Sequence, residues 1–414
     1  MLGKNTNVLI ATFSPWQKGI RLPINGNVEP MLDFFTPKVS TTVLIDQVYP
    51  GSDFVMPKTE IYKNSKKIVK NSAWWLYILY PFLKLVNTGG THIVFKLRDF
   101  LSVFDSAYVS KEKFDYFIGF EAVNAIAGVF LKKFGKVKKV IYYVSDYSPS
   151  RYSQKWFNNL YLLLDRYAAE HSDFIWDVSI AMQPARIKSG LRKKKSAPVF
   201  IVPNALYKSQ IESLSPNKVL RNSLVFMGTL GVENGPDLAI ESLPLVHKKV
   251  RDAKLYIVGG QSDDLERLKK LAAKLNMQKS VVFKGFIADR NKISQEIRKY
   301  AVALAPYKYI NGSARLYGDA TKIRAYMAAG LPTITTAVPP LGKAVAEKKA
   351  ALIVKDNPED IAKAIIRLLS DNKLFTEMKN NALNFAKNNT WENEYSRAFR
   401  EITDYESNHN LQPS

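Results

Sequence analysis

The sequence predicts an α/β fold with two doubly wound domains. Its 414 residues are too many for one ordinary core. Short apolar runs alternate with amphipathic runs on both sides of a polar stretch, Ala205–Arg221, which we interpret as the linker. Such alternation is typical of a parallel sheet covered by helices on both faces. Ligands of these sheets bind beyond the carboxyl ends of the strands, so we expect the two domains to face each other across a ligand-binding cleft.

The alternation is clearest after residue 222. The strands predicted there are SLVFMG, AKLYIVGG, SVVFKGF, VALAPY, LPTITT and AALIV. The helices between and after them are GPDLAIESLPLVHKKV, DDLERLKKLAAKLN, NKISQEIRKY, ATKIRAYMAAG and NPEDIAKAIIRLLSD. Before the linker the predicted strands are NVLIAT, STTVLIDQV, THIVFKL, FDYFIGF, KVIYYVSD, SDFIWDVS and PVFIVPN, with helices between them.

The composition is that of a globular protein with an anionic partner. Hydrophobic residues make up 46% of the chain and charged residues 23%. Sixty Lys and Arg against 37 Asp and Glu give a net charge of +23. The absence of cysteine excludes disulfides and thiolate metal sites, and none of the four histidines has metal-ligand spacing. We therefore expect no metal and no cofactor.

No targeting or membrane-spanning segment is expected. The first apolar run, NVLIATF, lacks a preceding basic region and is interpreted as a buried strand. The most apolar stretch, Ala73–Val86, is too short to cross a bilayer and contains Pro81 and Lys84. These features predict a cytoplasmic protein.

Five motifs in the C-terminal half occur together and in a fixed order. They are VPNA (Val202–Ala205), FMGTLGVENGPDLAIESL (Phe226–Leu243), LYIVGG, VVFKGFI and YMAAGLPTITT. In this order and spacing they resemble the group 1 glycosyltransferases, a large retaining family with the GT-B fold that uses nucleotide-diphosphate sugars. The resemblance covers about Val202–Leu369, together with a closing helix at Thr390–Ile402.

This resemblance implies two Rossmann-like domains with separate roles. Residues 1–206 would bind the acceptor, and a closing helix at about 390–404 would pack back on this domain. Residues 220–389 would bind the nucleotide-sugar donor. The implied activity is transfer of a hexosyl unit, with retention, during assembly of a surface polysaccharide or glycoconjugate.

The chain departs from the family at four polar positions. Family members usually carry an Arg directly after the first glycine and a Lys a few residues later, where this chain has Thr229 and Asn234. They also carry two glutamates about two helical turns apart. Alignment on the MAAG motif places Ala325 at the second position and Tyr317 near the first.

A variant pattern of the family carries a Lys near the start of the ATKIRAYMAAG helix, and Lys322 fits it. Asp319 precedes the helix and is predicted to cap it. A helix N-terminus attracts phosphate, so we expect the donor diphosphate here, beside Gly228 and Thr229. The resemblance places the base next to Phe286 and Ile287. The alternative is an ordinary capped helix with an exposed lysine.

Acceptor-side candidates follow strands of the N-terminal half. Lys18 and Arg21 bracket Gly19 in the loop after the first strand, and they could hold a phosphate or be solvated surface charges. Glu121 and Asp146 directly follow two later strands, at the predicted edge of the sheet. Either carboxylate could orient the acceptor hydroxyl or accept its proton, and the alternative role for each is helix capping.

A membrane partner is predicted from residues 63–80. Lys63, Lys66, Lys67 and Lys70 have the spacing of one helical face, and Trp74, Trp75, Tyr77 and Tyr80 follow. A basic stripe that leads into aromatic residues is typical of a segment in a membrane interface, and Lys132–Lys139 would add attraction to anionic lipid. We therefore expect peripheral attachment to the inner face of the cell membrane and a lipid-linked acceptor. Alternatively, the lysines are solvated and the aromatics are core.

Other functions share these features. A nucleotide-sugar epimerase shares the fold, because fold does not fix function. A catalytically inactive nucleotide- or glycan-binding relative would explain the four missing polar groups. Nucleic acid is not an expected partner, because the basic residues are scattered and no recognised binding motif is present.

Overall fold

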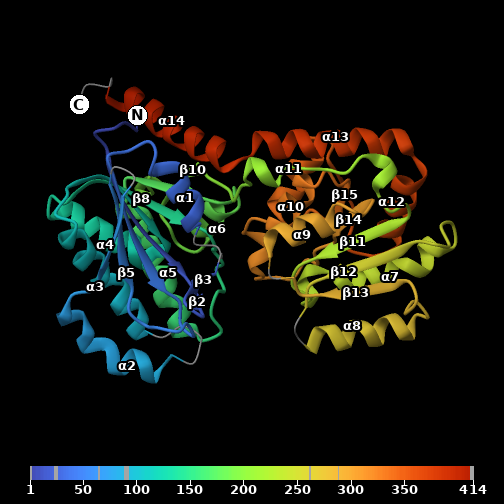
Figure 1. Ribbon diagram of the computed structural model, residues 1–414, viewed down its shortest axis with the longest axis horizontal. Coiled ribbons are helices and arrows are strands. Elements are labelled where there is room, and N and C mark those ends of the chain that lie inside the picture. The colour runs from blue at the N-terminus through green and yellow to red at the C-terminus, as the bar shows by residue number, and fades with distance from the viewer. Residues whose placement is uncertain are drawn as a thin grey trace. The chain divides into compact units, whose positions relative to one another are not determined.

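The computed structural model describes residues 2–22, 27–63, 66–87, 93–260, 263–287 and 289–410. The chain forms two compact units, one of Met1–Val202 with Tyr395–Ser414 and one of Pro203–Glu394 (Figure 1). Each unit contains a largely or wholly parallel sheet with helices on both faces. The predicted α/β class with two Rossmann-like domains is confirmed.

The N-terminal unit has an eight-stranded sheet in the order β10-β9-β8-β7-β1-β4-β5-β6. Its strands are β1 (Asn7–Ser14), β4 (Thr41–Val48), β5 (Lys58–Lys63), β6 (Lys66–Asn71), β7 (Phe114–Phe120), β8 (Val137–Val144), β9 (Phe174–Asp177) and β10 (Val199–Ile201). All neighbouring pairs are parallel except β4 with β5 and β5 with β6. Strands β2 (Trp16–Gln17) and β3 (Ile20–Arg21) form a separate small hairpin.

Helices of several lengths cover this sheet. They are α1 (Val28–Phe35), η1 (Trp74–Leu79), α2 (Tyr80–Leu85), α3 (Ile93–Val109), α4 (Glu121–Lys133), α5 (Lys155–His171), α6 (Met182–Lys188), η2 (Lys193–Lys195) and α14 (Trp391–Asn410). The last helix returns to this unit, where Phe399 stacks on Phe34 and meets Trp176 edge to face. Aromatic rings therefore hold the C-terminal end of the chain against the N-terminal sheet.

The C-terminal unit has a six-stranded, wholly parallel sheet in the order β13-β12-β11-β14-β15-β16. Its strands are β11 (Ser223–Met227), β12 (Lys254–Val258), β13 (Val281–Gly285), β14 (Val302–Ala305), β15 (Thr333–Thr335) and β16 (Ala351–Ile353). Its helices are η3 (Lys208–Gln210), η4 (Pro216–Lys218), η5 (Val232–Asn234), α7 (Pro236–His247), α8 (Asp263–Lys274), α9 (Arg290–Ile297), η6 (Ala314–Leu316), α10 (Thr321–Ala328), α11 (Pro340–Glu347), α12 (Pro358–Ser370) and α13 (Asn372–Asn388).

Alternation along the strands gives this sheet two cores. On β11, Leu224 and Phe226 point into one apolar cluster, and Val225 points into the cluster on the opposite face. Side chains alternate across a strand, and here both faces are covered, so the whole strand is apolar. This is why β11 appears in the sequence as a continuous apolar run.

The segment predicted as the linker packs on the C-terminal unit. Glu212 N donates to Ala328 O at 3.0 Å, and Lys379 Nζ donates to Leu214 O at 2.7 Å. Leu220 N donates to Lys299 O at 2.8 Å. The division between the units falls before this segment, between Val202 and Pro203.

Two predictions for the N-terminal half were wrong. The THIVFKL run belongs to helix α3 from Ile93 onward, because its apolar residues continue at helical spacing into the following segment. The predicted helix that carried Lys63, Lys66, Lys67 and Lys70 is instead the edge hairpin of β5 and β6. The lysine spacing also fits a strand with both faces exposed, and pairing of β5 with β4 and of β6 with β5 decided the outcome.

Candidate functional site

The carboxyl edge of the C-terminal sheet is formed by glycines at the ends of three neighbouring strands. Gly228, Gly259 and Gly285 have positive φ angles of 117°, 138° and 72°. Gly228 N donates to Val258 O, and Gly259 N donates to Gly285 O, both at 2.9 Å. A Cβ on Gly259 would lie 2.1 Å from Gly228 O, so this crossing tolerates no side chain. The edge therefore presents bare backbone that a ligand can approach closely.

Lys322, in the first turn of α10, points at this glycine edge. A Cβ added to Gly228 would lie 3.3 Å from the Lys322 Cε and 3.7 Å from its Nζ. The Nζ also lies 3.9 Å from the ring centroid of Phe226 and 5.0 Å from that of Tyr307. Lys322 is only 7% exposed, and within the described chain its Nζ has no hydrogen-bond partner. A buried amine of this kind is costly unless an anion approaches it.

The electrostatics at Lys322 favour an anion. Burial, with a smaller contribution from the cation Arg315, lowers the pKa of Lys322 well below its usual value. Arg315 itself is only partly engaged, with its Nε 3.2 Å from a carboxylate oxygen of Glu233. The first turn of α10 adds the positive end of the helix dipole. An approaching phosphate would satisfy the amine and the helix terminus together.

Thr229 and Asn234 hydrogen-bond to each other at this edge. The Asn234 Nδ2 donates to the Thr229 Oγ1 at 2.9 Å. The chain then turns at Gly235 into α7, and a Cβ there would lie 1.8 Å from Pro306 O. The loop after β11 is thus held in place by small and neutral residues.

Asp319 does not cap α10, so this prediction was wrong. The N-cap residue is Ala320, without a side-chain cap. The Asp319 carboxylate is taken by Arg324, whose Nε lies 2.7 Å away, and it also accepts from Asn204 N at 3.0 Å. Arg324 is almost fully buried, and a buried guanidinium requires a carboxylate more than a helix end requires a cap. Through these two contacts Asp319 holds the segment that leads into α10.

Phe286 and Ile287 lie in the loop after β13, next to Gly285. Phe286 is largely exposed, and Ile287 is partly buried against the core cluster that contains Ile323. An exposed ring at the carboxyl edge is available for stacking on a planar ligand.

In the N-terminal unit, Lys18 and Gly19 form the turn of the β2–β3 hairpin. Both have positive φ angles, 53° and 70°, as tight hairpin turns require. Gly19 N donates to the Asp53 carboxylate at 2.9 Å.

Arg21 forms ion pairs with two carboxylates. Its guanidinium lies 2.7 Å from Asp46 and 2.9 Å from Glu60, and its side chain is 14% exposed. One face of it also covers the Trp16 ring, with the Arg21 Cζ 5.0 Å from the ring centroid. These contacts give Arg21 a structural role that the sequence did not reveal.

Glu121 and Asp146 meet at the carboxyl edge of the N-terminal sheet. Glu121 begins α4 with a φ of 63°, which is strained for a residue with a side chain. Its carboxylate accepts from the Ser145 Oγ at 3.0 Å. Burial raises the pKa of Glu121, and the neighbouring Arg151 opposes that shift. Backbone strain and a perturbed carboxyl group are both frequent at functional sites.

Arg151 contacts Asp146 and acts electrostatically on Glu121. Its Nη1 donates to the backbone oxygen of Asp146 at 2.6 Å and lies 3.2 Å from the carboxylate of the same residue. The Asp146 side chain is 43% exposed and so remains accessible. The structure therefore brings together two predicted carboxylates and a cation that was not among the predicted site residues.

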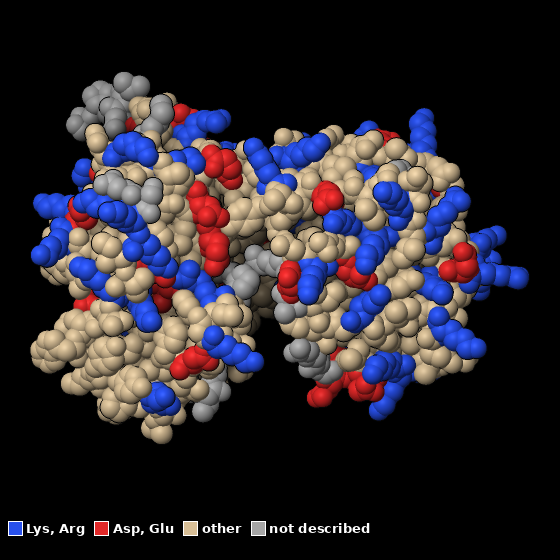
Figure 2. Space-filling model, viewed as in Figure 1, with Lys and Arg blue, Asp and Glu red and all other residues tan. Residues whose placement is uncertain are grey.

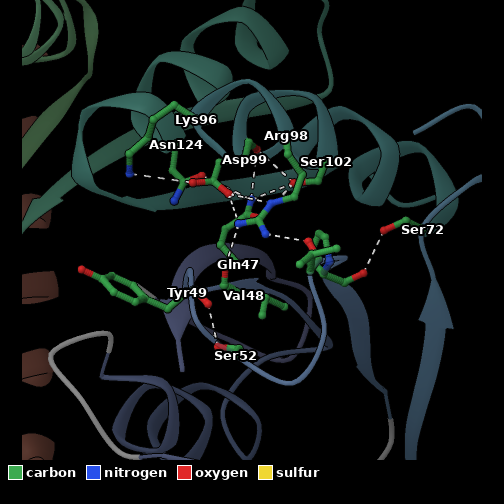
Figure 3. Close-up of polar contacts among 12 residues, drawn as sticks. Gln47, Val48, Tyr49, Ser52, Ser72, Lys96, Arg98, Asp99, Ser102 and Asn124 are labelled. Atoms are coloured by element: carbon green, nitrogen blue, oxygen red, sulfur yellow. Dashed lines mark hydrogen bonds and ion pairs between the residues drawn. The ribbon is translucent and has the colours of Figure 1, made fainter. Parts of the chain in front are cut away.

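A buried polar cluster borders this edge (Figure 3). The Gln47 Nε2, at the end of β4, donates to Asp99 O at 3.0 Å and to the Ser102 Oγ at 2.8 Å. Asn124 lies beside them and donates to Phe120 O at 2.9 Å. Lys96 lies 3.8 Å from the Asp99 carboxylate. Lys96 and Asp99 were missed because they lie on a helix that was predicted in part as a strand.

Comparison with known proteins places this geometry in a family. The model of the glycosyl transferases group 1 matches residues 211–385, which hold the glycine edge and Lys322. The C-terminal part of the chain therefore matches the group 1 glycosyltransferases. Over 401 residues it is 24% identical to an uncharacterized glycosyltransferase, MJ1069, of Methanocaldococcus jannaschii, covering 93% of this chain and 97% of that protein.

Solved structures agree on the fold of this glycosyltransferase. Anabaena Alr3699/HepE, crystallised in complex with UDP, superposes with a TM-score of 0.65 at 13% identity, covering 96% of this chain and 100% of that one. The lipopolysaccharide outer core galactosyltransferase WaaB superposes with a TM-score of 0.62 at 12% identity, again covering 96% and 100%. At these identities the likeness establishes the GT-B type of fold.

Within the described residues of the glycosyltransferase, no group of three His, Asp or Glu side chains could hold a metal ion. None of the described helices is long and apolar enough to cross a membrane.

Proposed function

We propose that this glycosyltransferase moves a hexosyl unit, with retention, from a nucleotide-diphosphate sugar to a lipid-linked or glycan acceptor. The reaction would serve assembly of a surface polysaccharide or glycoconjugate. The observation that carries the proposal is Lys322, a buried amine that points at a bare glycine edge and has no hydrogen-bond partner among the described residues. The complex of HepE with UDP-glucose supports a nucleotide-sugar donor.

The donor diphosphate would lie between Lys322 and the Gly228–Thr229 backbone, with the base against Phe286 and Ile287. As the glycosidic bond breaks, negative charge grows on the departing diphosphate. Lys322, the α10 terminus and the nearby Arg315 would stabilise that charge in surroundings where electrostatic interactions are strong. We propose that the chain is a divergent member of its family, in which Lys322 replaces the cations absent at Thr229 and Asn234. The enzyme would then bind its donor without the paired glutamates, whose positions are taken by Ala325 and the region of Tyr317.

The acceptor hydroxyl would be oriented by the carboxylates at the N-terminal edge. Asp146 is accessible and held by Arg151, so it can accept a hydrogen bond from the hydroxyl in a fixed geometry. Glu121 has a raised pKa, which suits a group that receives a proton. Lys18 and Gly19 would remain available to bind an acceptor phosphate. The Arg21 guanidinium of the same loop would not, because it is paired with two carboxylates.

We also propose that the acceptor is presented at an anionic membrane, on its cytoplasmic face, with no nucleic acid involved. The net charge of +23 supports an anionic partner. A lipid-linked acceptor would keep the enzyme peripheral to the membrane.

Incubation with a panel of radiolabelled nucleotide sugars and a lipid extract tests the proposal. Label transferred to the lipid or glycan fraction is the expected result. Isomerisation of the sugar without transfer would indicate an epimerase. Nucleotide binding without any turnover would indicate an inactive relative, and either outcome would overturn the proposed activity.

A further inference from the structure

The segment Trp74–Leu85 of the N-terminal unit exposes large apolar side chains on its outer face. Trp74, Ile78 and Leu85 are 87%, 74% and 78% exposed, and Phe82 is more than half exposed. All four belong to η1 and α2, whose buried residues are Leu76 and Leu83. We call these four residues the η1–α2 face. Figure 2 shows a surface largely free of charged residues at the lower left, where Figure 1 places α2.

The opposite side of the same segment is firmly packed. Leu76 and Leu83 are fully buried, in a small core with Val55, Met56 and Phe95. The start of the segment is also anchored, because Ala73 N donates to the Asp105 carboxylate at 3.1 Å. The packing of the buried side therefore fixes the position of the η1–α2 face on the unit. A large contiguous apolar surface on a folded unit indicates a binding partner.

The chemistry around the η1–α2 face indicates which partner. Residues 66–86 contain four lysines and no acidic residue. Lys84 lies within the segment, near the Tyr80 ring, and the exposed edge strand β6 adds Ile68 and Val69 between Lys66 and Lys70. Apolar side chains flanked by Tyr, Trp and Lys match the interface of an anionic bilayer, where rings lie at the headgroup level and lysines reach the phosphates.

We propose that the η1–α2 face inserts into the interface of an anionic lipid bilayer and holds the N-terminal unit on the membrane. This inference deepens the lipid partner of the proposed function and rests on it. Insertion of apolar side chains supplies most of the attachment, and the lysines add a smaller, salt-dependent share.

The lysines predicted from the sequence have other contacts in the hairpin. Lys63 lies 2.9 Å from the Glu112 carboxylate, and Lys67 lies 3.0 Å from that of Glu60. Lys70 donates to Val109 O at 3.3 Å. Their attraction to lipid is partly cancelled by these partners, so attachment through lysines alone would be weak and would vanish in salt. Attachment through the η1–α2 face would persist.

Sedimentation with vesicles tests the inference. The probes are phosphatidylcholine vesicles with and without phosphatidylglycerol, at low and high salt. The wild-type chain is expected to bind the anionic vesicles and to keep much of that binding in high salt. The variant Trp74→Ala/Ile78→Ser/Leu85→Ser should lose at least tenfold in vesicle affinity, on the order expected for three lost apolar anchors.

A matched control uses equally exposed apolar residues of the same unit. Trp156 and Ile180 are each 67% exposed and lie outside the segment, so Trp156→Ala/Ile180→Ser should bind vesicles as the wild type does. Binding of UDP by calorimetry should be the same in all three proteins, which separates this inference from the donor site.

Three outcomes would overturn the inference. The triple variant could bind vesicles as tightly as the wild type, or the wild type could bind no vesicles at all. The wild type could also form a dimer that the triple variant converts to a monomer, which would make a second copy of the chain the partner. Failure of the wild type to bind UDP would instead contradict the proposed donor site and would leave the vesicle result unaffected.

Discussion

The two carboxyl edges of this protein differ in how their charges are neutralised. At the edge of the C-terminal sheet, glycines leave the backbone bare, and Lys322 is buried with no hydrogen-bond partner in the part of the chain that the structure describes. At the edge of the N-terminal sheet, Asp146 is held by Arg151, and Glu121 accepts from Ser145. A site with an unneutralised cation suits an anionic ligand, whereas a site of paired groups suits an uncharged one such as a sugar hydroxyl. The contrast supports the proposal that the donor diphosphate binds to one unit and the acceptor hydroxyl to the other.

The largest effect is expected at the N-terminal edge, on catalysis. Asp146→Asn and Glu121→Gln keep shape and hydrogen bonding but remove the carboxylates that we propose orient the acceptor hydroxyl. We expect kcat to fall by about 10²–10⁴-fold in the more important of the two. Steady-state transfer assays measure this, and UDP affinity by calorimetry should not change. A weakened UDP affinity would show that the two edges do not divide the roles in this way.

Replacing Arg21 tests whether this cation of the N-terminal unit stabilises the fold or binds a ligand. Arg21→Ala should destabilise the protein by about 3 kcal/mol, because it removes the guanidinium from the buried Asp46 and leaves Glu60 with only the half-exposed Lys67. Denaturant unfolding measures the loss. Lys18→Ala, an exposed neighbour, is the control and should change stability by less than about 0.5 kcal/mol. If Arg21→Ala is as stable as the control and instead weakens acceptor binding, Arg21 is a ligand-binding residue.

Lys322→Ala should weaken UDP binding by about 1.5–3 kcal/mol, the range for a hydrogen bond to a charged group. Calorimetry measures the affinity. Lys308 is the control, because it lies in the same unit but is paired with Asp237 at 3.1 Å. Equal UDP affinities for the wild type and Lys322→Ala would remove Lys322 from the donor site.

The smallest effect concerns pH. Burial lowers the pKa of Lys322 below its unfolded value, so the unfolded chain binds a proton that the folded chain holds less well. The free energy of unfolding therefore decreases as pH falls below the pKa of Lys322 in the unfolded chain. It stops decreasing once pH is below the pKa of Lys322 in the folded chain. We expect Lys322→Met to be more stable than the wild type at neutral pH, by about 1 kcal/mol. Unfolding curves recorded from neutral to alkaline pH should converge near the unfolded pKa.

Binding of an anion should reverse this shift. If UDP contacts Lys322, the diphosphate raises the pKa of the amine, so at a pH between the pKa values of the free and the bound state calorimetry in buffers of different ionisation enthalpy should detect proton uptake. Lys322→Arg stays charged at every pH and should bind UDP without the uptake at Lys322. An uptake that persists in Lys322→Arg would have to come from another group.

Most of the fold could be predicted because its signals are local. The strands of the C-terminal sheet are continuous apolar runs separated by amphipathic helices, and this pattern can be recognised without knowing the partners. The failures lie where pairing decides the structure. Residues 66–71, KKIVKN, combine lysines with two aliphatic residues in an order that suits several conformations, and only hydrogen bonding to β5 made them a strand. The run from Ile93 was apolar enough for a strand and became a helix.

The candidate site was predictable as a set of positions but not as a set of contacts. The sequence alone placed Glu121, Asp146 and Lys322 after strands or at the start of a helix, because the carboxyl ends of parallel strands share an edge. Only the tertiary structure decided what each charge meets. Arg21 forms ion pairs with two carboxylates, Asp319 pairs with a buried arginine, and Lys322 lies against two aromatic rings. Charged groups take partners from segments distant in sequence, because an unpaired charge is costly once burial removes water, and no local pattern encodes those partners.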